Sequence, residues 1–160
     1  MILLNNSRLH RTIKRMAFQV VEEAGGEPII MVGLNERGFS VASLMEKFIQ
    51  EEGAAEVNLL QLFVEEEKEL DIEKPIPENS ILVIVDDVIF SGITMFNALE
   101  SIPELTSFKN VYVAAVVDRG HRKVPVQAGI VGVTIPTKLN EHVDFRLSNN
   151  KPKEVLITKQ

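Results

Sequence analysis

Two adjacent carboxylates and a short hydroxyl-rich turn are the residues of this chain best equipped for chemistry. Asp86 and Asp87 follow the apolar run 81–85, and the turn begins four residues later. The turn consists of Ser91, Gly92, Ile93 and Thr94. Its hydroxyls and backbone N–H groups can hold a phosphate at the positive end of a helix dipole. The two acids can hold sugar hydroxyls, directly or through Mg²⁺. We therefore expect a site for a phosphorylated sugar.

The apolar run before the acids makes this pattern informative. Its five residues, 81–85, are short enough for a fully buried central strand. An isolated Asp-Asp pair after a strand is also explained by loop solvation and a helix N-cap, with Gly92 as an ordinary turn residue. The whole block 81–96 favours the phosphorylated-sugar site, because each of its segments meets a separate requirement of one ligand.

The elements that position this site alternate between two periodicities. Apolar residues recur at helical spacing over 13–24 and 41–49, and Gly25 ends the first of these helices. We expect strands at 29–34, 57–64, 81–86 and 111–117, a helix at about 92–101, and weaker strands near 130–135, 142–146 and 154–158. Helices that alternate with apolar strands predict an α/β fold with a mainly parallel, doubly wound sheet and flanking helices.

Length and composition are typical of a cytoplasmic enzyme. The 160 residues predict a single domain that spans 1–160. Cysteine is absent, which excludes a disulfide framework, a thiol nucleophile and a thiolate metal site. No window approaches the ~18 apolar residues of a membrane span, so we expect no membrane partner. The net charge of −6 argues against broad nonspecific binding of nucleic acid, although it is compatible with a local basic patch.

In a doubly wound sheet, ligands bind beyond the carboxyl ends of the strands, where the strand order reverses. Three loops of unusual composition follow the strands expected at 29–34, 81–86 and 111–117. The first is a short polar turn of Asn35, Glu36, Arg37 and Gly38, with Gly38 opening the next helix. The second carries the acids and the hydroxyl-rich turn. The third is a cationic loop of Asp118, Arg119, Gly120, His121, Arg122 and Lys123.

The segment 116–137 adds a family resemblance. It reads VVDRGHRKVPVQAGIVGVTIPT and resembles the PyrR family of pyrimidine operon attenuators, whose members are also uracil phosphoribosyltransferases. The similarity extends through RMAFQVVEE near the N-terminus, VGLNERG at 32–38 and VDDVIFSGIT at 85–94. The last of these also resembles the 5-phosphoribosyl-1-pyrophosphate (PRPP) motif of type I phosphoribosyltransferases.

The resemblance implies a type I phosphoribosyltransferase fold with a small hood. It implies an enzyme that converts PRPP and a base, uracil first, to a nucleoside monophosphate and pyrophosphate with Mg²⁺. It also implies a homodimer or larger homo-oligomer. Asp86 and Asp87 would face the ribose hydroxyls and meet the metal indirectly, and the turn 91–94 would wrap the 5′-phosphate. Residues 35–38 would hold pyrophosphate.

Further roles follow from the same resemblance. Asp86, Asp87 and Arg37 would carry the catalysis, with Arg37 as the cation for pyrophosphate, although a surface ion pair is the alternative for that side chain. The residues expected near the substrate are Asn35, Glu36, Gly38, Val88, Phe90, Ser91, Gly92, Ile93, Thr94, Asp118, Arg119 and Ile135.

The chain departs from the family in ways that keep three functions open. The segment expected to close over PRPP, 65–73, carries six acids and one cation, Lys68. Ile93 replaces an arginine of relatives, and Phe18 and Val133 replace a histidine and a lysine. The candidates are a PRPP-dependent enzyme, a PRPP- or nucleotide-binding protein of weak turnover, and an RNA-binding regulator of pyrimidine genes. We rank them in that order, because the RNA surface would rest on Arg11, Lys14, Arg15, Arg119, Arg122 and Lys123.

Overall fold

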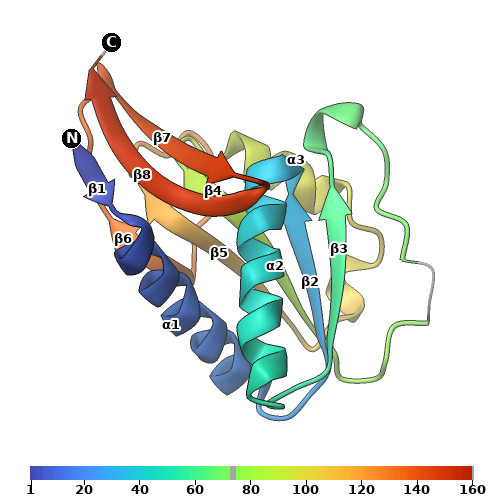
Figure 1. Ribbon diagram of the computed structural model, residues 1–160. Helices are drawn as coiled ribbons and strands as arrows, with labels where there is room; N and C mark the ends of the chain where they lie inside the picture. The colour runs from blue at the N-terminus through green and yellow to red at the C-terminus, as the bar shows by residue number, and fades with distance from the viewer. Residues whose placement is uncertain (73–74, 160) are drawn as a thin grey trace.

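Five parallel strands form the central sheet of the protein, which the computed structural model describes over residues 1–72 and 75–159. The strands are β2 (Ile29–Leu34), β3 (Val57–Leu62), β4 (Ile81–Ile89), β5 (Asn110–Asp118) and β6 (Ile130–Thr134). They lie in the order β3-β2-β4-β5-β6, and every neighbouring pair is parallel. The strand order therefore reverses between β2 and β4 (Figure 1).

Helices cover both faces of this sheet because its strands are apolar on both sides. α1 (Asn6–Ala24) and α2 (Asn35–Glu51) pack on the face that carries Met31 and Val83 (Figure 1). α3 (Ile93–Glu100) packs on the opposite face over Val32 and Ile84, together with the 3-10 turns η1 (Val64–Glu66) and η2 (Leu105–Ser107). This arrangement confirms the predicted α/β, doubly wound fold.

The ends of α1 follow from local chemistry. The side chain of Asn5 accepts a hydrogen bond from the backbone N–H of Arg8 at 2.9 Å, which caps the first turn. At the other end, Gly25 adopts a left-handed conformation with φ 56°, and its N–H donates to the carbonyl of Val21. The predicted helix stop at Gly25 is confirmed.

A second, three-stranded sheet forms a hood beside the carboxyl ends of the central strands (Figure 1). Its antiparallel strands, in the order β1-β8-β7, are β1 (Ile2–Leu4), β7 (Glu141–Ser148) and β8 (Lys151–Lys159). Phe145 and Val155 anchor the hood in the core shared with α1 and α2. β1 is absent from the strands predicted above, because its three residues are too few to show a period and it depends on pairing with β8.

Three boundaries differ from the prediction where the site is built. β4 continues to Ile89, because residues 86–89 keep pairing with β5, so the acid pair lies within the strand and not after it. α2 begins at Asn35, so residues 35–38 are its first turn; the prediction of a separate polar turn is wrong. β3 ends at Leu62, after which the chain turns into η1. Within the described ranges, no helix has the length and apolarity to cross a membrane.

Candidate active site

The predicted site residues gather at the carboxyl edge of the central sheet, next to the reversal of strand order. β2 leads directly into α2, and β4 leads through residues 90–92 into α3, so both helices begin at this edge. The first N–H groups of a helix have no partner within it and carry the positive end of its dipole. A ligand at this edge therefore meets two helix N-termini beside two carboxylates.

The acid pair occupies successive positions of β4 but differs in exposure. Asp86 is only 7% exposed, whereas Asp87 is half-buried. The backbone N–H of Asp87 donates to the Asp86 carboxylate at 2.9 Å. Burial raises the pKa of Asp86 well above its ordinary value, and the charge and side chain of Asp87 act in the same direction. A ligand that brings a cation or hydrogen-bond donors would therefore stabilise the ionised pair.

The donor chemistry of this pair suits magnesium better than a metal held by protein alone. Across residues 1–72 and 75–159, no group of three or more histidine, cysteine or acidic side chains is arranged to hold a metal ion. Mg²⁺ is commonly bound through one or two carboxylates together with substrate phosphates and water. Asp86 and Asp87 fit that role, provided that the substrate contributes the remaining oxygens.

Gly38 brings the first turn of α2 into direct contact with the acid pair. A Cβ atom at this position would lie 2.6 Å from the carbonyl oxygen of Val85 and 3.4 Å from a carboxylate oxygen of Asp86. Any larger residue would push the helix away from β4. The glycine predicted to open a phosphate-type turn therefore acts through the close approach of helix and strand.

Two other side chains of that turn are engaged within the protein. Asn35 has a φ of 55°, and its side-chain oxygen accepts a hydrogen bond from the backbone N–H of Val64 at 3.1 Å. Arg37 donates from Nε to the carbonyl of Phe145 in β7 at 2.8 Å. Glu36 is exposed. These contacts tie the start of α2 to η1 and to the hood. The first backbone N–H groups of the helix have no acceptor within it and stay available to a ligand.

The hydroxyl-rich turn forms the N-terminus of α3. The Ser91 hydroxyl accepts a hydrogen bond from the N–H of Ile93 at 3.3 Å, and Gly92 has a φ of 85°. The first helical hydrogen bond runs from Phe96 to the carbonyl of Gly92 at 2.9 Å. The N–H groups that precede it, including that of Thr94, have no place in the helical ladder. The predicted phosphate turn, 91–94, thus coincides with the first turn of α3.

The loop after β5 covers the other side of this turn and meets the hood. Arg119 is 8% exposed, and its guanidinium lies 4.3 Å from the ring centroid of Phe90. It donates to the Thr137 hydroxyl at 2.9 Å and to the carbonyl of Glu141 at 2.7 Å. The backbone of Ile135 pairs with that of Asp118 at 2.8 Å. The sequence does not predict the contact with Glu141, because it is made by the backbone carbonyl, which every residue type has.

One predicted contact residue points elsewhere. Val88 packs against the apolar core on the α1 and α2 face of the sheet. The structure thus brings Phe90 against Arg119 and pairs Ile135 with Asp118, and it brings the first turn of α2 against Asp86. The side chain of Val88 belongs to the apolar core.

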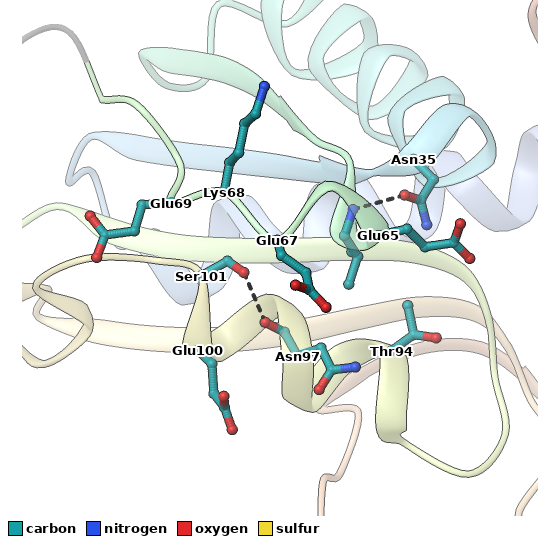
Figure 2. A pocket seen from close by; sticks show the side chains of 10 residues that line it. Asn35, Glu65, Glu67, Lys68, Glu69, Thr94, Asn97, Glu100 and Ser101 are labelled. Atoms are coloured by element: carbon teal, nitrogen blue, oxygen red, sulfur yellow. Dashed lines mark hydrogen bonds between the residues drawn. The ribbon is translucent and has the colours of Figure 1, made fainter.

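The acidic segment lies against α3 and encloses a cavity of about 610 Å³ with it. Val64 and Leu70 bury their side chains, and the N–H of Leu70 donates to the carbonyl of Ser101 at 2.7 Å. In Figure 2, Glu67 lies over α3, and Lys68 points away from the cavity. The lining residues are Asn35, Val64, Glu65, Glu67, Lys68, Glu69, Thr94, Asn97, Glu100 and Ser101.

This cavity adds residues that sequence reasoning missed. Asn97 and Ser101 stand at helical spacing with the predicted residue Thr94 on one side of the α3 segment. That polar stripe is the signal that could have identified Asn97 and Ser101. Glu73, the last acid of the segment predicted to close over the site, lies outside the described residues.

Two of the six cations proposed for an RNA surface, Arg119 and Arg122, are both engaged within the protein and largely withdrawn from solvent. Arg119 is buried on Phe90, and Arg122 forms an ion pair with Asp118 with 14% of its side chain exposed. Arg11, Lys14 and Arg15 are exposed on α1. Arg15 donates to the carbonyl of Gly132 at 2.6 Å. The patch available to an external partner is therefore smaller than the sequence suggests.

Comparison with solved structures agrees with this architecture. The hypoxanthine phosphoribosyltransferase of Trypanosoma cruzi superposes with a TM-score of 0.72 at 14% identity, covering 99% of this chain and 96% of that one. A hypoxanthine-guanine phosphoribosyltransferase from Bacillus anthracis gives a TM-score of 0.66 at 22% identity, with 86% and 83% covered. The parallel sheet, its hood and the site at the carboxyl edge thus define the type I phosphoribosyltransferase fold.

The sequence comparisons identify the family. The phosphoribosyl transferase domain profile matches residues 2–149. The chain is 32% identical over 158 residues to a bifunctional protein PyrR from Haemophilus ducreyi, with 91% of this chain and 88% of the relative covered. A bifunctional protein PyrR from Thermus aquaticus is also 32% identical, with 91% and 87% covered. The chain therefore belongs to the phosphoribosyltransferase family, as an enzyme that resembles the PyrR proteins.

Proposed function

We propose that the protein transfers the 5-phosphoribosyl group of PRPP to uracil, giving the nucleoside monophosphate and pyrophosphate in the presence of Mg²⁺. The bond from the anomeric carbon to pyrophosphate breaks, a bond to a ring nitrogen of the base forms, and that nitrogen loses its proton. The observation that carries the proposal is the position of the α2 and α3 N-termini beside the acid pair of β4. This arrangement suits a sugar diol with a phosphate group at each end.

Each part of PRPP has a counterpart in the site. The turn 91–94 would hold the 5′-phosphate, and the first turn of α2, 35–38, would hold pyrophosphate with Arg37 nearby. Asp86 and Asp87 would accept hydrogen bonds from the ribose hydroxyls. Positive charge develops on the ribose as pyrophosphate leaves, and carboxylates close to the ring stabilise it. Orientation of the two reactants supplies much of the remaining rate enhancement.

Magnesium completes the proposed site. When bound, Mg²⁺ would neutralise charge on the leaving pyrophosphate. Asp86 and Asp87 would hold it indirectly, through the ribose hydroxyls or water. The half-buried Asp87 would be the more accessible partner, and the buried Asp86 would be fixed by the backbone N–H of its neighbour.

The choice of base rests on the donors of Arg119, with Asp118 and Ile135 beside it. A guanidinium has five donor hydrogens and no acceptor. Arg119 uses Nε and Nη2 on Thr137 and Glu141, and its Nη1 has no hydrogen-bond partner among the described residues. Such a group favours a base that presents a carbonyl oxygen over one that presents an amino group. Uracil meets this requirement, and the similarity to PyrR proteins supports it.

The decisive experiment is a base screen with PRPP and Mg²⁺. We expect nucleotide formation, followed by chromatography, to be fastest with uracil and at background with cytosine and adenine. Calorimetry with PRPP alone runs in parallel. Formation of inosine or guanosine monophosphate without uridine monophosphate would overturn the base assignment, and absence of PRPP binding would overturn the whole proposal.

A PRPP-binding protein of weak turnover is the second candidate, and the acidic cavity beside Thr94 favours it. The acids Glu65, Glu67 and Glu69 would lie near a highly anionic substrate. In the base screen, PRPP binding without product would support this candidate. A homodimer or larger assembly stays a prediction, which sedimentation of the purified protein tests.

Removing acids from the cavity should strengthen PRPP binding. Replacing Glu65, Glu67 and Glu69 with glutamine is expected to lower the KM for PRPP about two- to fivefold at low salt, because fewer like charges face the substrate. The matched control replaces Glu51, Glu52 and Glu56, which lie at the other end of α2 and before β3, so the net charge changes equally. An equal effect of both triple variants would show that overall charge, not the cavity, is responsible.

We predict no tight, sequence-specific RNA complex at physiological salt. Contacts with RNA phosphates dominate such affinities. The exposed cations of α1 would attract these phosphates, but the net charge of −6 repels them. A filter-binding assay with the leader RNA of its own pyrimidine genes should give a Kd weaker than about 1 µM, in the range of nonspecific binding. Nanomolar binding that is lost on Lys14→Glu would contradict this prediction and favour the regulator.

A further inference from the structure

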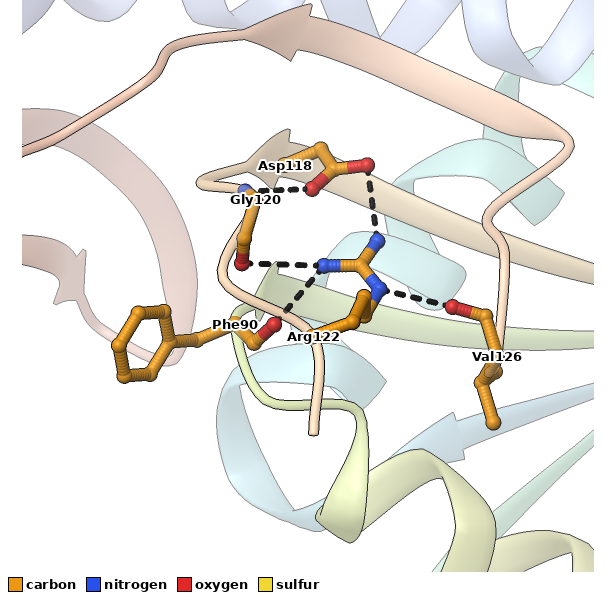
Figure 3. Close-up of polar contacts among 5 residues, drawn as sticks. All are labelled: Phe90, Asp118, Gly120, Arg122 and Val126. Atoms are coloured by element: carbon orange, nitrogen blue, oxygen red, sulfur yellow. Dashed lines mark hydrogen bonds and ion pairs between the residues drawn. The ribbon is translucent and has the colours of Figure 1, made fainter. Parts of the chain in front are cut away.

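The guanidinium of Arg122 lies at the centre of a hydrogen-bond cluster between the loop after β5 and the turn before α3 (Figure 3). Nη2 donates to the Asp118 carboxylate at 2.8 Å, and Nε donates to the carbonyl of Val126 at 2.7 Å. Nη1 donates to the carbonyl of Phe90 at 2.9 Å and, at 3.4 Å, to that of Gly120. Because four acceptors surround the planar guanidinium, the Arg122 side chain is held in one orientation.

Asp118 is committed to the same cluster. One of its oxygens accepts from Arg122, and the other accepts from the backbone N–H of Gly120 at 2.9 Å. Its side chain is 15% exposed, close to the 14% of Arg122. Both groups are therefore largely withdrawn from solvent and paired, and neither is directed to an external ligand.

The cluster fixes the carbonyl groups of the turn that leads into α3. Arg122 binds the carbonyl of Phe90, and the N–H groups of Lys123 and Val124 bind the carbonyl of Ser91 at 2.8 and 3.2 Å. Val124 also encloses Gly92, since a Cβ there would lie 3.1 Å from its side chain. One side of the turn is thus held against residues 122–124.

Holding these carbonyls determines where the turn's donors point. In a planar trans peptide the N–H lies opposite the C=O of the same unit. The carbonyl of Phe90 shares its peptide with the N–H of Ser91, and the carbonyl of Ser91 shares its peptide with the N–H of Gly92. Both N–H groups are therefore directed away from residues 122–124, toward the open side of the turn.

We propose that Arg122, oriented by Asp118, is a positioning residue for the 5′-phosphate: it aims the N–H of Ser91 through the Phe90 carbonyl, and the backbone of the neighbouring residues 123 and 124 aims the N–H of Gly92. This inference rests on the function proposed above. Arg122 does not touch the substrate; it acts through the peptide units of the turn. Its loss should therefore affect ligands with a 5′-phosphate and spare the part of the site that binds the base.

The test compares uridine 5′-monophosphate with uridine by calorimetry, in the wild type and in Arg122→Gln. We expect the Kd for the nucleotide to rise about ten- to a hundredfold, the effect of losing charge-assisted hydrogen bonds, and the Kd for uridine to stay within about twofold. In steady state, the KM for PRPP should rise while that for the base does not. Arg146→Gln, from the exposed pair of Arg146 and Asp144, is the matched control.

Two further variants keep the test informative if Arg122→Gln does not fold. Arg122→Lys keeps the charge but not the planar guanidinium, so its Kd for the nucleotide should lie between those of the wild type and Arg122→Gln. Asp118→Asn should raise the same Kd, but by less than Arg122→Gln does. If Arg122→Gln does not fold, these two variants decide the question. Unchanged nucleotide affinity, or an equal loss for nucleotide and nucleoside, would overturn the positioning role. A wild type that binds neither PRPP nor nucleotide would overturn the proposed function as well.

Discussion

Replacing Asp86 and Asp87 together with asparagine is expected to abolish the Mg²⁺-dependent binding of PRPP while the fold remains intact. Both carboxylates belong to the carboxyl-terminal part of β4, where the proposed ribose diol would lie, and asparagine cannot supply their charge. Calorimetry with PRPP, with and without Mg²⁺, measures the effect. The conservative Asp144→Asn, at an exposed pair in the hood, should bind like the wild type. Unchanged affinity in the double variant would rule out the acid pair as the ribose and metal site.

The single variant Asp86→Asn should be more stable than the wild type near neutral pH. Burial, and then the charge of Asp87, raises the pKa of Asp86 in the folded protein. The native state therefore holds a proton more tightly than the unfolded chain, and stability falls as the pH rises from the ordinary aspartate range through the raised pKa. Asparagine does not titrate, so Asp86→Asn should remove this decline. Urea unfolding of both proteins across that pH range measures it.

Gly38→Ala is expected to destabilise the protein and to weaken PRPP binding. The new methyl group would meet the carbonyl of Val85 at 2.6 Å, so the start of α2 must move away from β4 and the acid pair. Overpacking of this kind costs about 1–3 kcal/mol. Alanine otherwise favours a helix over glycine by about 1 kcal/mol, so a net loss of stability means that the cost of the clash exceeds this gain.

Gly129→Ala provides the matched control for Gly38→Ala. A Cβ at Gly129 has no atom within 4 Å, so its stability should change by less than about 1 kcal/mol. Chemical denaturation gives the free energies, and PRPP titration of each folded variant gives the affinities. A Gly38→Ala protein as stable and as active as the wild type would show that α2 can shift without disturbing the site.

Much of the fold could be predicted because its central strands have apolar residues on both faces. Residues 29–34 and 81–85 read as uninterrupted apolar runs, and the structure buries them between two layers of helices. β1 could not be predicted, because its three residues form a strand only by pairing with residues near 156. The start of α2 was misplaced because Asn35, in a left-handed conformation, joins strand and helix without an intervening loop.

The site, like the fold, has parts that depend on neighbouring residues and parts that depend on contacts between distant residues. Only the first kind could be predicted from the sequence. The acid pair and the turn 91–94 could be found because their requirements are contiguous in the chain. The contacts of Arg119 with Thr137 and Glu141 join residues 18 and 22 positions apart, and that of Arg122 with Phe90 joins residues 32 positions apart. Two of these three acceptors are backbone carbonyls, which any residue type provides. Sequence reasoning therefore assigned Arg122 to a surface patch, whereas the structure pairs it with Asp118.

The pairing of β1 with β8 has a consequence for the order in which the protein is made. Ile2 lies opposite Leu156, so β1 can form this pairing only after β8 has been made. The last strand of the parallel sheet ends at Thr134, so the acid pair and the turn 91–94 are made before the hood strands β7 and β8. Domains fold during synthesis from the N-terminal end, and pairings between distant segments form slowly. A chain stalled before residue 141 would thus lack the carbonyl that fixes Arg119, so the side of the site proposed for the base would be incomplete.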